Sequence, residues 1–389
     1  MQKQLVLVLI LLVSTVFAAQ ILKRTKDKTT SKLIKDHGYP AEDHRIETED
    51  GNVLQAFRIP YSHKLQNQNK TRPIVLLQHG LMSSSDIWVL SGPDNALAYL
   101  LADSGFDVWI GNNRGNEYSL ELKEPSWNFS WHEIGLYDIS AMIDYALKTN
   151  GQGQKSIHYV GHSQGTTVFF TLMSLRPEYN QKIKTSHMLS PVAIMKNTKN
   201  ECVVSAANFY TADGMLTSFN RDTKFLNIFR SKSNTFNERC VFLMDCYNMD
   251  KKLHSEHANK TAIKEADKIS ADGSWNQVLH YLFNHKSGYF RQFDYDSKKN
   301  LEVYKSKQPP EYPVEKITSE VHLWYVDNDD LVDPVDVLAL ADRLPNKVLH
   351  HIQEPIFGHA DYTIHNDIRK YVNDPVINIM HKYELDKEK

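Results

Sequence analysis

Short apolar runs alternate along the chain with longer stretches whose apolar residues follow helical spacing. Residues 157–160 form a short run with β-branched members, which favours a buried strand, and residues 166–173 after it are typical of a helix. Similar runs predict further strands at residues 74–77, 106–110, 321–326 and 348–352. Helical spacing predicts helices at residues 95–104, 133–148, 335–344 and 366–381. Strands that alternate with helices predict an α/β fold around a mostly parallel central sheet with helices on both faces.

The start of the chain follows a different pattern. Residues 31–37 have the composition of a short helix that stops at Gly38-Tyr39-Pro40. Residues 42–48 and 53–60 have strand character and flank Glu49-Asp50-Gly51, and an Asp-Gly pair between two strands indicates a hairpin. We therefore expect an antiparallel pair of strands ahead of the parallel part of the sheet.

The α/β alternation stops near residue 195 and returns near residue 320. The stretch between these positions has no clear strand, many aromatic residues and all three cysteines. We interpret it as a mostly helical cap, or lid, inserted into the α/β core. The predicted organisation is a signal peptide at 1–19, core at 20–194, cap at 195–313 and core again at 314–389. Within the cap, residues 225–229 place bulky groups on one helical face, which fits either a lid over the site or packing against the core.

The first residues predict the compartment. Lys3 precedes an apolar run at residues 5–17, and Ala18-Ala19 supplies small residues for cleavage, which is the pattern of a signal peptide. The alternative, a membrane anchor, is disfavoured because the run is shorter than a typical span. Entry into the secretory pathway gives meaning to three N-glycosylation sequons, which begin at Asn69, Asn128 and Asn259.

Composition excludes some classes of function. The formal net charge is −2 and no basic stripe is present, which argues against a nucleic-acid-binding protein. An odd count of cysteines in a secreted chain suggests one disulfide and one free thiol, and spacing leaves the pairing of Cys202, Cys240 and Cys246 open. Neither C-x-x-C nor H-E-x-x-H occurs, so we expect no zinc and no other cofactor.

Gly161-His162-Ser163-Gln164-Gly165 matches the G-x-S-x-G pattern and lies between the predicted strand and helix. Both glycines suit a turn too tight for a Cβ atom, and the serine is held in strained backbone geometry. Such a turn presents the serine Oγ at a helix N-terminus, where free N–H groups stabilise an oxyanion. The motif therefore predicts that Ser163 is a nucleophile.

A serine nucleophile needs a base and a carboxylate, which follow it along the chain in this fold. His359 is the histidine of the loop after the last predicted strand, and the loop after the strand at 321–326 offers four aspartates, at positions 327, 329, 330 and 333. The backbone N–H groups of Leu81 and Gln164 are the expected oxyanion donors. His79 and His162 are interpreted as structural residues beside the site.

Several ordered motifs together resemble the acid lipase family, which includes gastric and lysosomal acid lipases. They are His79-Gly80-Leu81 with Ser84 and Trp88, Gly111-Asn112 with Arg114-Gly115-Asn116, the serine motif, Asp329 and Leu331 with Asp333-Pro334, and Gly358-His359. The resemblance extends from Gly38 to the final helix. It implies an α/β-hydrolase core with a lidded cap, and it assigns the triad acid to Asp329, although Asp330 departs from the family pattern.

The resemblance implies a secreted or lysosomal serine ester hydrolase, active at low pH on triacylglycerols, steryl esters or both. We expect an acyl-enzyme mechanism, a lipid–water interface as the place of action, no integral membrane span and a monomeric protein. Two other classes remain as hypotheses. One is a catalytically silent lipid-binding protein, which loss of Ser163 or His359 would favour. The other is a serine carboxypeptidase-like hydrolase, which an acidic or basic pocket motif would favour.

Overall fold

The computed structural model describes residues 29–119, 126–212, 257–260, 262 and 272–387. The predicted signal peptide, the cap residues 225–229, Cys240, Cys246 and the side chain of Cys202 lie outside this part. Among the described residues, no helix is both long enough and apolar enough to cross a membrane.

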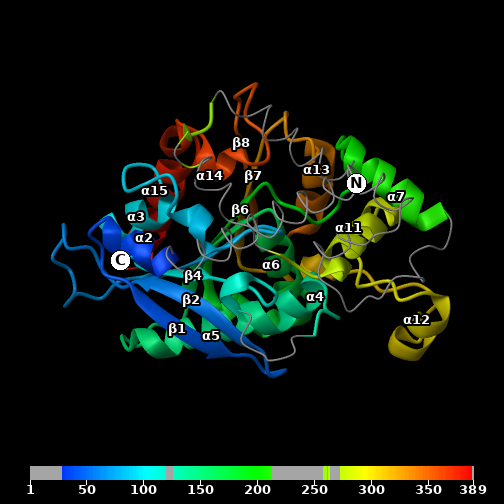
Figure 1. Ribbon diagram of the computed structural model, residues 1–389, viewed down its shortest axis with the longest axis horizontal. Coiled ribbons are helices and arrows are strands. Elements are labelled where there is room, and N and C mark those ends of the chain that lie inside the picture. Colours follow the sequence, from blue (N-terminus) through cyan, green and yellow to red (C-terminus); the bar gives the residue numbers. More distant parts are fainter. Residues whose placement is uncertain (1–28, 120–125, 213–256, 261, 263–271, 388–389) are drawn as a thin grey trace, which may run out of the picture.

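An eight-stranded sheet with the order β1-β2-β4-β3-β5-β6-β7-β8 forms the centre of the molecule (Figure 1). The strands are β1 Glu42–Glu47, β2 Val53–Ile59, β3 Ile74–Gln78, β4 Asp107–Gly111, β5 Ile157–His162, β6 Ile183–Leu189, β7 Glu320–Tyr325 and β8 Lys347–His351. Strand β2 pairs antiparallel with β1 and β4, and every other pairing is parallel. The predicted hairpin and the mostly parallel sheet are both confirmed.

The central strands β3 and β4 are buried along their whole length because helices cover both faces of the sheet. Successive side chains of a strand point to opposite faces. In β3, Ile74 and Leu76 join one buried cluster, whereas Val75 and Leu77 join the other. The first cluster includes residues of helices α5, α6 and α13, and the second includes residues of α2, α3 and α15. The chain thus has a three-layer α/β core.

The helices of the core are α2 Thr30–Asp36, α3 Leu97–Asp103, α4 Trp131–Glu133, α5 Ser140–Asn150, α6 Gln164–Leu175, α13 Pro334–Arg343, α14 Asp361–Ile364 and α15 Asp374–Lys387. Each of them except α14 overlaps a stretch for which the sequence predicts a helix. Short 3₁₀ helices cover Ser85–Trp88, Glu117–Ser119, Pro177–Lys182 and Val314–Lys316. The predicted helix at 133–148 contains a π-helical stretch, Ile134–Ile139, in which Gly135 lies so close to α6 that a Cβ would come within 2.7 Å of the Thr171 Cβ. A second π-helical stretch, Arg369–Asn373, precedes α15.

In the described residues between β6 and β7, three α-helices gather at one end of the molecule (Figure 1). They are α7 Glu201–Ala212, α11 Trp275–Ser287 and α12 Ser297–Tyr304. Helices α7 and α11 share a separate apolar cluster that includes Ala207, Trp275 and Leu279. The described part of this segment contributes no strand to the sheet.

Candidate active site

The loops after β5, β7 and β8 carry the three predicted catalytic side chains. Ser163 directly follows β5, Asp329 lies four residues beyond the end of β7, and His359 lies in the loop between β8 and α14. The three strands are parallel, so their carboxyl ends lie at the same edge of the sheet. This edge is where open α/β sheets bind their ligands.

The turn at Ser163 has the tight geometry that the motif predicts. Ser163 has a positive φ of 53°, a backbone conformation that costs energy for a residue other than glycine. A Cβ at Gly161 would lie 2.6 Å from the Gly165 carbonyl carbon, and a Cβ at Gly165 would collide with the Gln78 carbonyl oxygen. Helix α6 begins at the next residue, Gln164, so the Ser163 side chain stands at the N-terminal end of this helix.

A continuous chain of hydrogen bonds joins the three side chains. His359 Nε2 lies 2.8 Å from Ser163 Oγ. His359 Nδ1 lies 3.1 Å and 3.0 Å from the two carboxylate oxygens of Asp329. With Nδ1–H donating to the carboxylate, Nε2 is left to accept the proton of the serine hydroxyl, which is the arrangement of a nucleophile, a base and an orienting acid.

Asp329 is buried but remains suited to carry a negative charge. Burial raises its pKa more than any single contact lowers it, yet the attraction of His359, the hydrogen bonds from His359 and Ser190 and the Val332 N–H together hold the pKa below its ordinary value. The N–H groups of Leu331 and Val332 both donate to Oδ1 at 3.0 Å. The Asp329 carboxylate is therefore held in place by its own loop as well as by the imidazole.

The neighbouring Asp330 points to a different part of the molecule. Its carboxylate accepts a hydrogen bond of 2.6 Å from Asn200 Nδ2, and its carbonyl oxygen accepts from Lys199 N and from the Thr198 hydroxyl. These partners lie immediately before α7. Asp330 thus ties the acid loop to the start of the cap, whereas Asp329 faces the base.

The loop that carries His359 is held by a second histidine. His162 Nε2–H donates to the His359 carbonyl oxygen at 2.9 Å, and the two ring centroids are 5.2 Å apart. At the other side of the loop, Gly358 N–H donates to the Asp361 carboxylate at 2.8 Å. The histidine inside the serine motif therefore fixes the backbone of His359, the candidate base.

The predicted oxyanion turn is shaped by His79. Its Nε2 accepts a bond of 3.4 Å from Asn113 N–H, so Nδ1 carries the proton and donates to the Gly80 carbonyl oxygen at 2.7 Å. Burial lowers the pKa of His79 to about 4, so the ring is neutral above that pH. In a trans peptide the C=O and N–H point in opposite directions, so fixing the Gly80 carbonyl also fixes the Leu81 N–H. The turn lies against the nucleophile, since a Cβ at Gly80 would be 3.1 Å from the Ser163 Cβ.

Two side chains at the site had no signal in the sequence. Ser190 Oγ lies 2.6 Å from Asp329 Oδ2, and Gln277 of α11 donates from Nε2 to Gln164 Oε1 at 3.1 Å. A serine after a strand and a glutamine in a helix are common in any chain. Only the pairing of distant segments reveals that these two lie beside the acid and beside an oxyanion residue.

The chain is similar to known families and proteins over most of its length. Residues 30–92 match a family described as a partial alpha/beta-hydrolase lipase region, and residues 73–362 match the alpha/beta hydrolase fold. Lipase 3 of Drosophila melanogaster is 39% identical over 90% of this chain and 92% of its own length. Human gastric triacylglycerol lipase is 34% identical over 90% of each chain. The chain belongs to the acid lipase-like family of α/β-hydrolases.

Solved structures show the same fold at low sequence identity. A putative aryl esterase from Burkholderia cenocepacia superimposes with a TM-score of 0.55 at 14% identity, over 88% of this lipase and 99% of the esterase. A putative lipase from Acinetobacter baumannii gives a TM-score of 0.52 over 92% and 95% of the two chains. Family and fold together identify the protein as a lipid ester hydrolase, that is, a carboxylic ester hydrolase of the α/β-hydrolase type.

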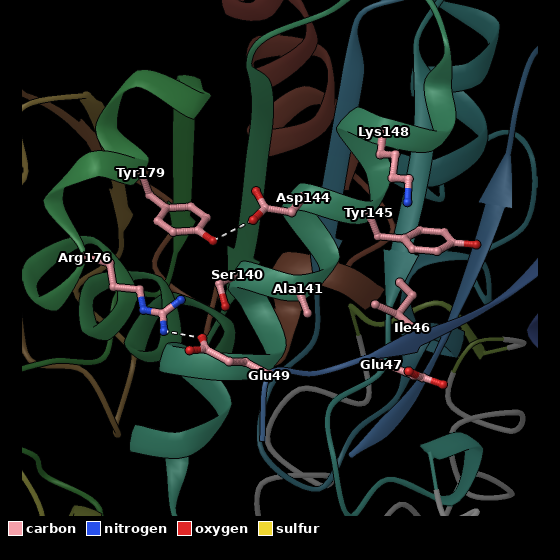
Figure 2. Close-up of a pocket in the computed structure, with 10 residues that line it drawn as sticks. All are labelled: Ile46, Glu47, Glu49, Ser140, Ala141, Asp144, Tyr145, Lys148, Arg176 and Tyr179. Atoms are coloured by element: carbon pink, nitrogen blue, oxygen red, sulfur yellow. Dashed lines mark hydrogen bonds and ion pairs between the residues drawn. The ribbon is translucent and has the colours of Figure 1, made fainter. Parts of the chain in front are cut away.

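A separate surface cavity of about 320 Å³ lies between β1 and helix α5 (Figure 2). Arg176 and Tyr179, beyond α6, complete its wall. Arg176 pairs with Glu49 at 2.5 Å, and the Tyr179 hydroxyl donates to Asp144 at 2.9 Å. Four of its polar side chains are therefore bound in two pairs, and none of the three side chains of the candidate site lines it.

Proposed function

We propose that this lipase hydrolyses the ester bonds of neutral lipids, triacylglycerols or steryl esters, at a lipid–water interface and releases free fatty acids. The observation that carries the proposal is the hydrogen-bonded chain from Ser163 through His359 to Asp329. The substrate class is supported by the relatives named gastric triacylglycerol lipase, from cattle and humans. In this proposal the protein acts as a monomer and needs no cofactor.

In the first half of the proposed reaction, Ser163 Oγ attacks the ester carbonyl carbon while its proton passes to His359 Nε2. Asp329 stabilises the imidazolium that forms. The tetrahedral oxyanion accepts hydrogen bonds from the backbone N–H groups of Leu81 and Gln164. As the intermediate collapses, the bond to the alcohol breaks and His359 gives its proton to the departing oxygen, which leaves an acyl-enzyme.

In the second half, water replaces the alcohol. His359 accepts a proton from the water as its oxygen attacks the acyl carbon, and the same N–H groups stabilise the second oxyanion. The ester bond to Ser163 then breaks, the serine recovers its proton from His359, and the fatty acid is released. The partial exposure of Ser163 among buried neighbours is consistent with access by substrate.

The proposal includes activity at acid pH and a secreted or lysosomal location. The low pKa of His79, about 4, supports activity at acid pH because Nε2 keeps accepting the Asn113 N–H beside the oxyanion turn down to that range. Of the predicted glycosylation sites, Asn69 and Asn128 are exposed, and Asn259 is half-buried with its Oδ1 accepting from Ala262 N–H. Glycosylation and the signal peptide remain predictions, testable by endoglycosidase digestion and N-terminal sequencing of the secreted chain.

A substrate panel tests the proposed function. Purified protein is assayed on emulsified triolein, cholesteryl oleate and soluble p-nitrophenyl butyrate from pH 4 to pH 8, beside the variant Ser163→Ala. We expect turnover of at least one long-chain ester with an acid optimum, and loss of all turnover in the variant with an unchanged melting temperature. A silent lipid-binding protein would bind the emulsion without turnover, and a carboxypeptidase-like enzyme would cleave peptides instead; either result contradicts the proposal.

A further inference from the structure

Ser190 lies at the centre of the hydrogen bonds that hold the base and the acid together. It follows the last residue of β6, and its side chain is buried, with 1% of the residue exposed. Its Oγ is 2.6 Å from Asp329 Oδ2 and 2.9 Å from His359 Nδ1. The Asp329 carboxylate is an acceptor, so the Ser190 hydroxyl donates to it, and Asp329 thus receives a second side-chain donor besides the imidazole.

The backbone around Ser190 is fixed to the strands that carry the other members of the site. Ser190 N–H donates to the Trp324 carbonyl oxygen of β7 at 3.0 Å. The carbonyl oxygen of Leu189, the preceding residue, accepts the N–H of Ser163 at 3.1 Å. The hydroxyl is therefore held in register with both the nucleophile turn and the acid loop.

The conformation of Ser190 is costly for a serine. Its φ is 53°, in the left-handed region that glycine occupies freely and other residues occupy at an energetic cost. A glycine would relieve this cost but would remove the hydroxyl. A strained backbone that delivers one hydrogen bond to a catalytic carboxylate points to a role in the function of the site.

We propose that Ser190 is a positioning residue that extends the activity of this lipase to lower pH through Asp329. The inference rests on the proposed function, in which Asp329 holds His359. A hydroxyl that donates to the carboxylate takes up part of its negative charge, so the carboxylate stabilises the imidazolium less strongly. His359 then releases its proton, and becomes a base, at a lower pH than it would beside a carboxylate without this donor.

The other titratable groups near His359 stay in place when Ser190 is changed. The ring of His162 is 5.2 Å from that of His359, and the Tyr362 ring is 6.0 Å from that of His162. Asp361 lies in the same loop and accepts from Gly358 N–H. None of these side chains is bonded to Ser190 in the described contacts, so a change in pH dependence reports on the Asp329–His359 pair.

The test compares Ser190→Ala and Ser190→Gly with Ser186→Ala, whose buried hydroxyl in the same strand donates to the Glu320 carbonyl oxygen. The measurement is kcat/KM on a soluble ester as a function of pH. Both Ser190 variants should move the acid limb upward by about 0.5 to 1 pH unit, which is about a 3- to 10-fold loss on that limb. Ser186→Ala should leave both the plateau and the acid limb close to wild type.

The melting temperature distinguishes the effect of losing the Ser190 hydroxyl from the effect of its strained backbone. Ser190→Gly relieves the positive φ and should melt above Ser190→Ala, although both show the same shifted acid limb. An acid limb that stays in place or moves to lower pH in both variants overturns the inference. Turnover that survives in Ser163→Ala overturns the proposed function instead, so the two failures can be told apart.

Discussion

Two groups of histidines in this lipase have different partners. The histidines of the site, His79, His162 and His359, lie at or beyond the carboxyl ends of the strands. A second group, here called the histidine ladder, crosses the sheet itself: His158 of β5, His187 of β6, His322 of β7 and His350 of β8. The side chains of these four histidines lie on the face of the sheet that α15 covers. Glu384 of α15 bonds to His158 Nε2 at 2.9 Å.

The ladder histidines contact one another. His322 Nδ1 lies 2.8 Å from His350 Nε2, and the ring of His187 stacks on that of His322 with centroids 4.7 Å apart. Thr185 bridges His158 and His187 through its hydroxyl. Burial lowers the pKa of all four, that of His350 to about 4, so the ladder is neutral at ordinary pH.

The comparison shows that the partners of the two ring nitrogens, rather than burial, distinguish a base from a packing residue. His359 has a carboxylate on Nδ1 and a hydroxyl nucleophile on Nε2. His158 has the two kinds of partner reversed, with the Thr185 hydroxyl at Nδ1 and the Glu384 carboxylate at Nε2. No other ladder histidine pairs a carboxylate with a hydroxyl among its described contacts. A carboxylate at Nδ1 both sets the tautomer and stabilises the charge that the base acquires.

The largest effect is expected when His359 loses the negative charge of its carboxylate partner, Asp329. Asp329→Asn leaves the size of the side chain nearly unchanged but offers an amide where the imidazolium needs a negative charge. In serine hydrolases such a change can cost on the order of 10⁴-fold in rate, and we expect a loss of that size in kcat on a soluble ester.

Asp330→Asn is the matched control, because the next residue in the same loop contacts Asn200 and the start of the cap. It should lower the rate by less than about 10-fold, since the contacts it weakens are structural. If the Asp330 variant is the more damaging of the two, the assignment of the triad acid is wrong.

The features of the fold that depend on local sequence could be predicted. The strand, turn and helix around Ser163 are encoded by contiguous residues, and so is the hairpin at Asp50-Gly51. The chain order of nucleophile, acid and base follows from which strand precedes each loop. The structure brings Ser163, Asp329 and His359 within hydrogen-bonding distance, and their catalytic roles stay a prediction until the variants are measured.

The features that depend on strand register and on long-range packing could not be predicted. The register of β6 against β7 places His187 beside His322, and nothing near either residue reveals the other. Likewise, Ser190 meets Asp329 only because β6 and β7 are neighbours and the chain turns with a positive φ. The π-helical stretch before α5 also follows from packing, since Gly135 approaches α6 closely.

A smaller effect is expected from His79, whose described hydrogen-bond partners are all neutral. His79→Leu removes the donor to the Gly80 carbonyl oxygen and frees the Leu81 N–H from its fixed direction. We expect kcat to fall by about 10- to 100-fold, somewhat less than for direct loss of an oxyanion donor. His79→Asn keeps a donor near the position of Nδ1 and should recover part of the loss, measured as kcat on the same soluble ester. Equal loss in both variants would mean that the side chain only fills space.

The smallest effect concerns stability and is specific to the ladder. The pKa of His350 is about 4 in the folded chain, against 6.5 for the free side chain. Between these values the unfolded chain binds a proton that the folded chain does not, so stability falls as the pH drops from about 6.5 to about 4. Below about 4 both states bind it, and the loss from this group is complete.

His350→Gln removes this titration and keeps a polar group near His322. The variant loses the stacking of His350 on Trp324, with centroids 3.9 Å apart, so its melting temperature at pH 7 should be lower than that of wild type. The informative quantity is therefore the fall in melting temperature between pH 7 and pH 4, which should shrink by roughly 2 °C. His351→Gln is the matched control, since the adjacent histidine is exposed and pairs with Asp327 at 3.0 Å. If the melting temperature of His350→Gln falls between pH 7 and pH 4 as much as that of wild type, protonation of His350 does not limit the acid stability of this lipase.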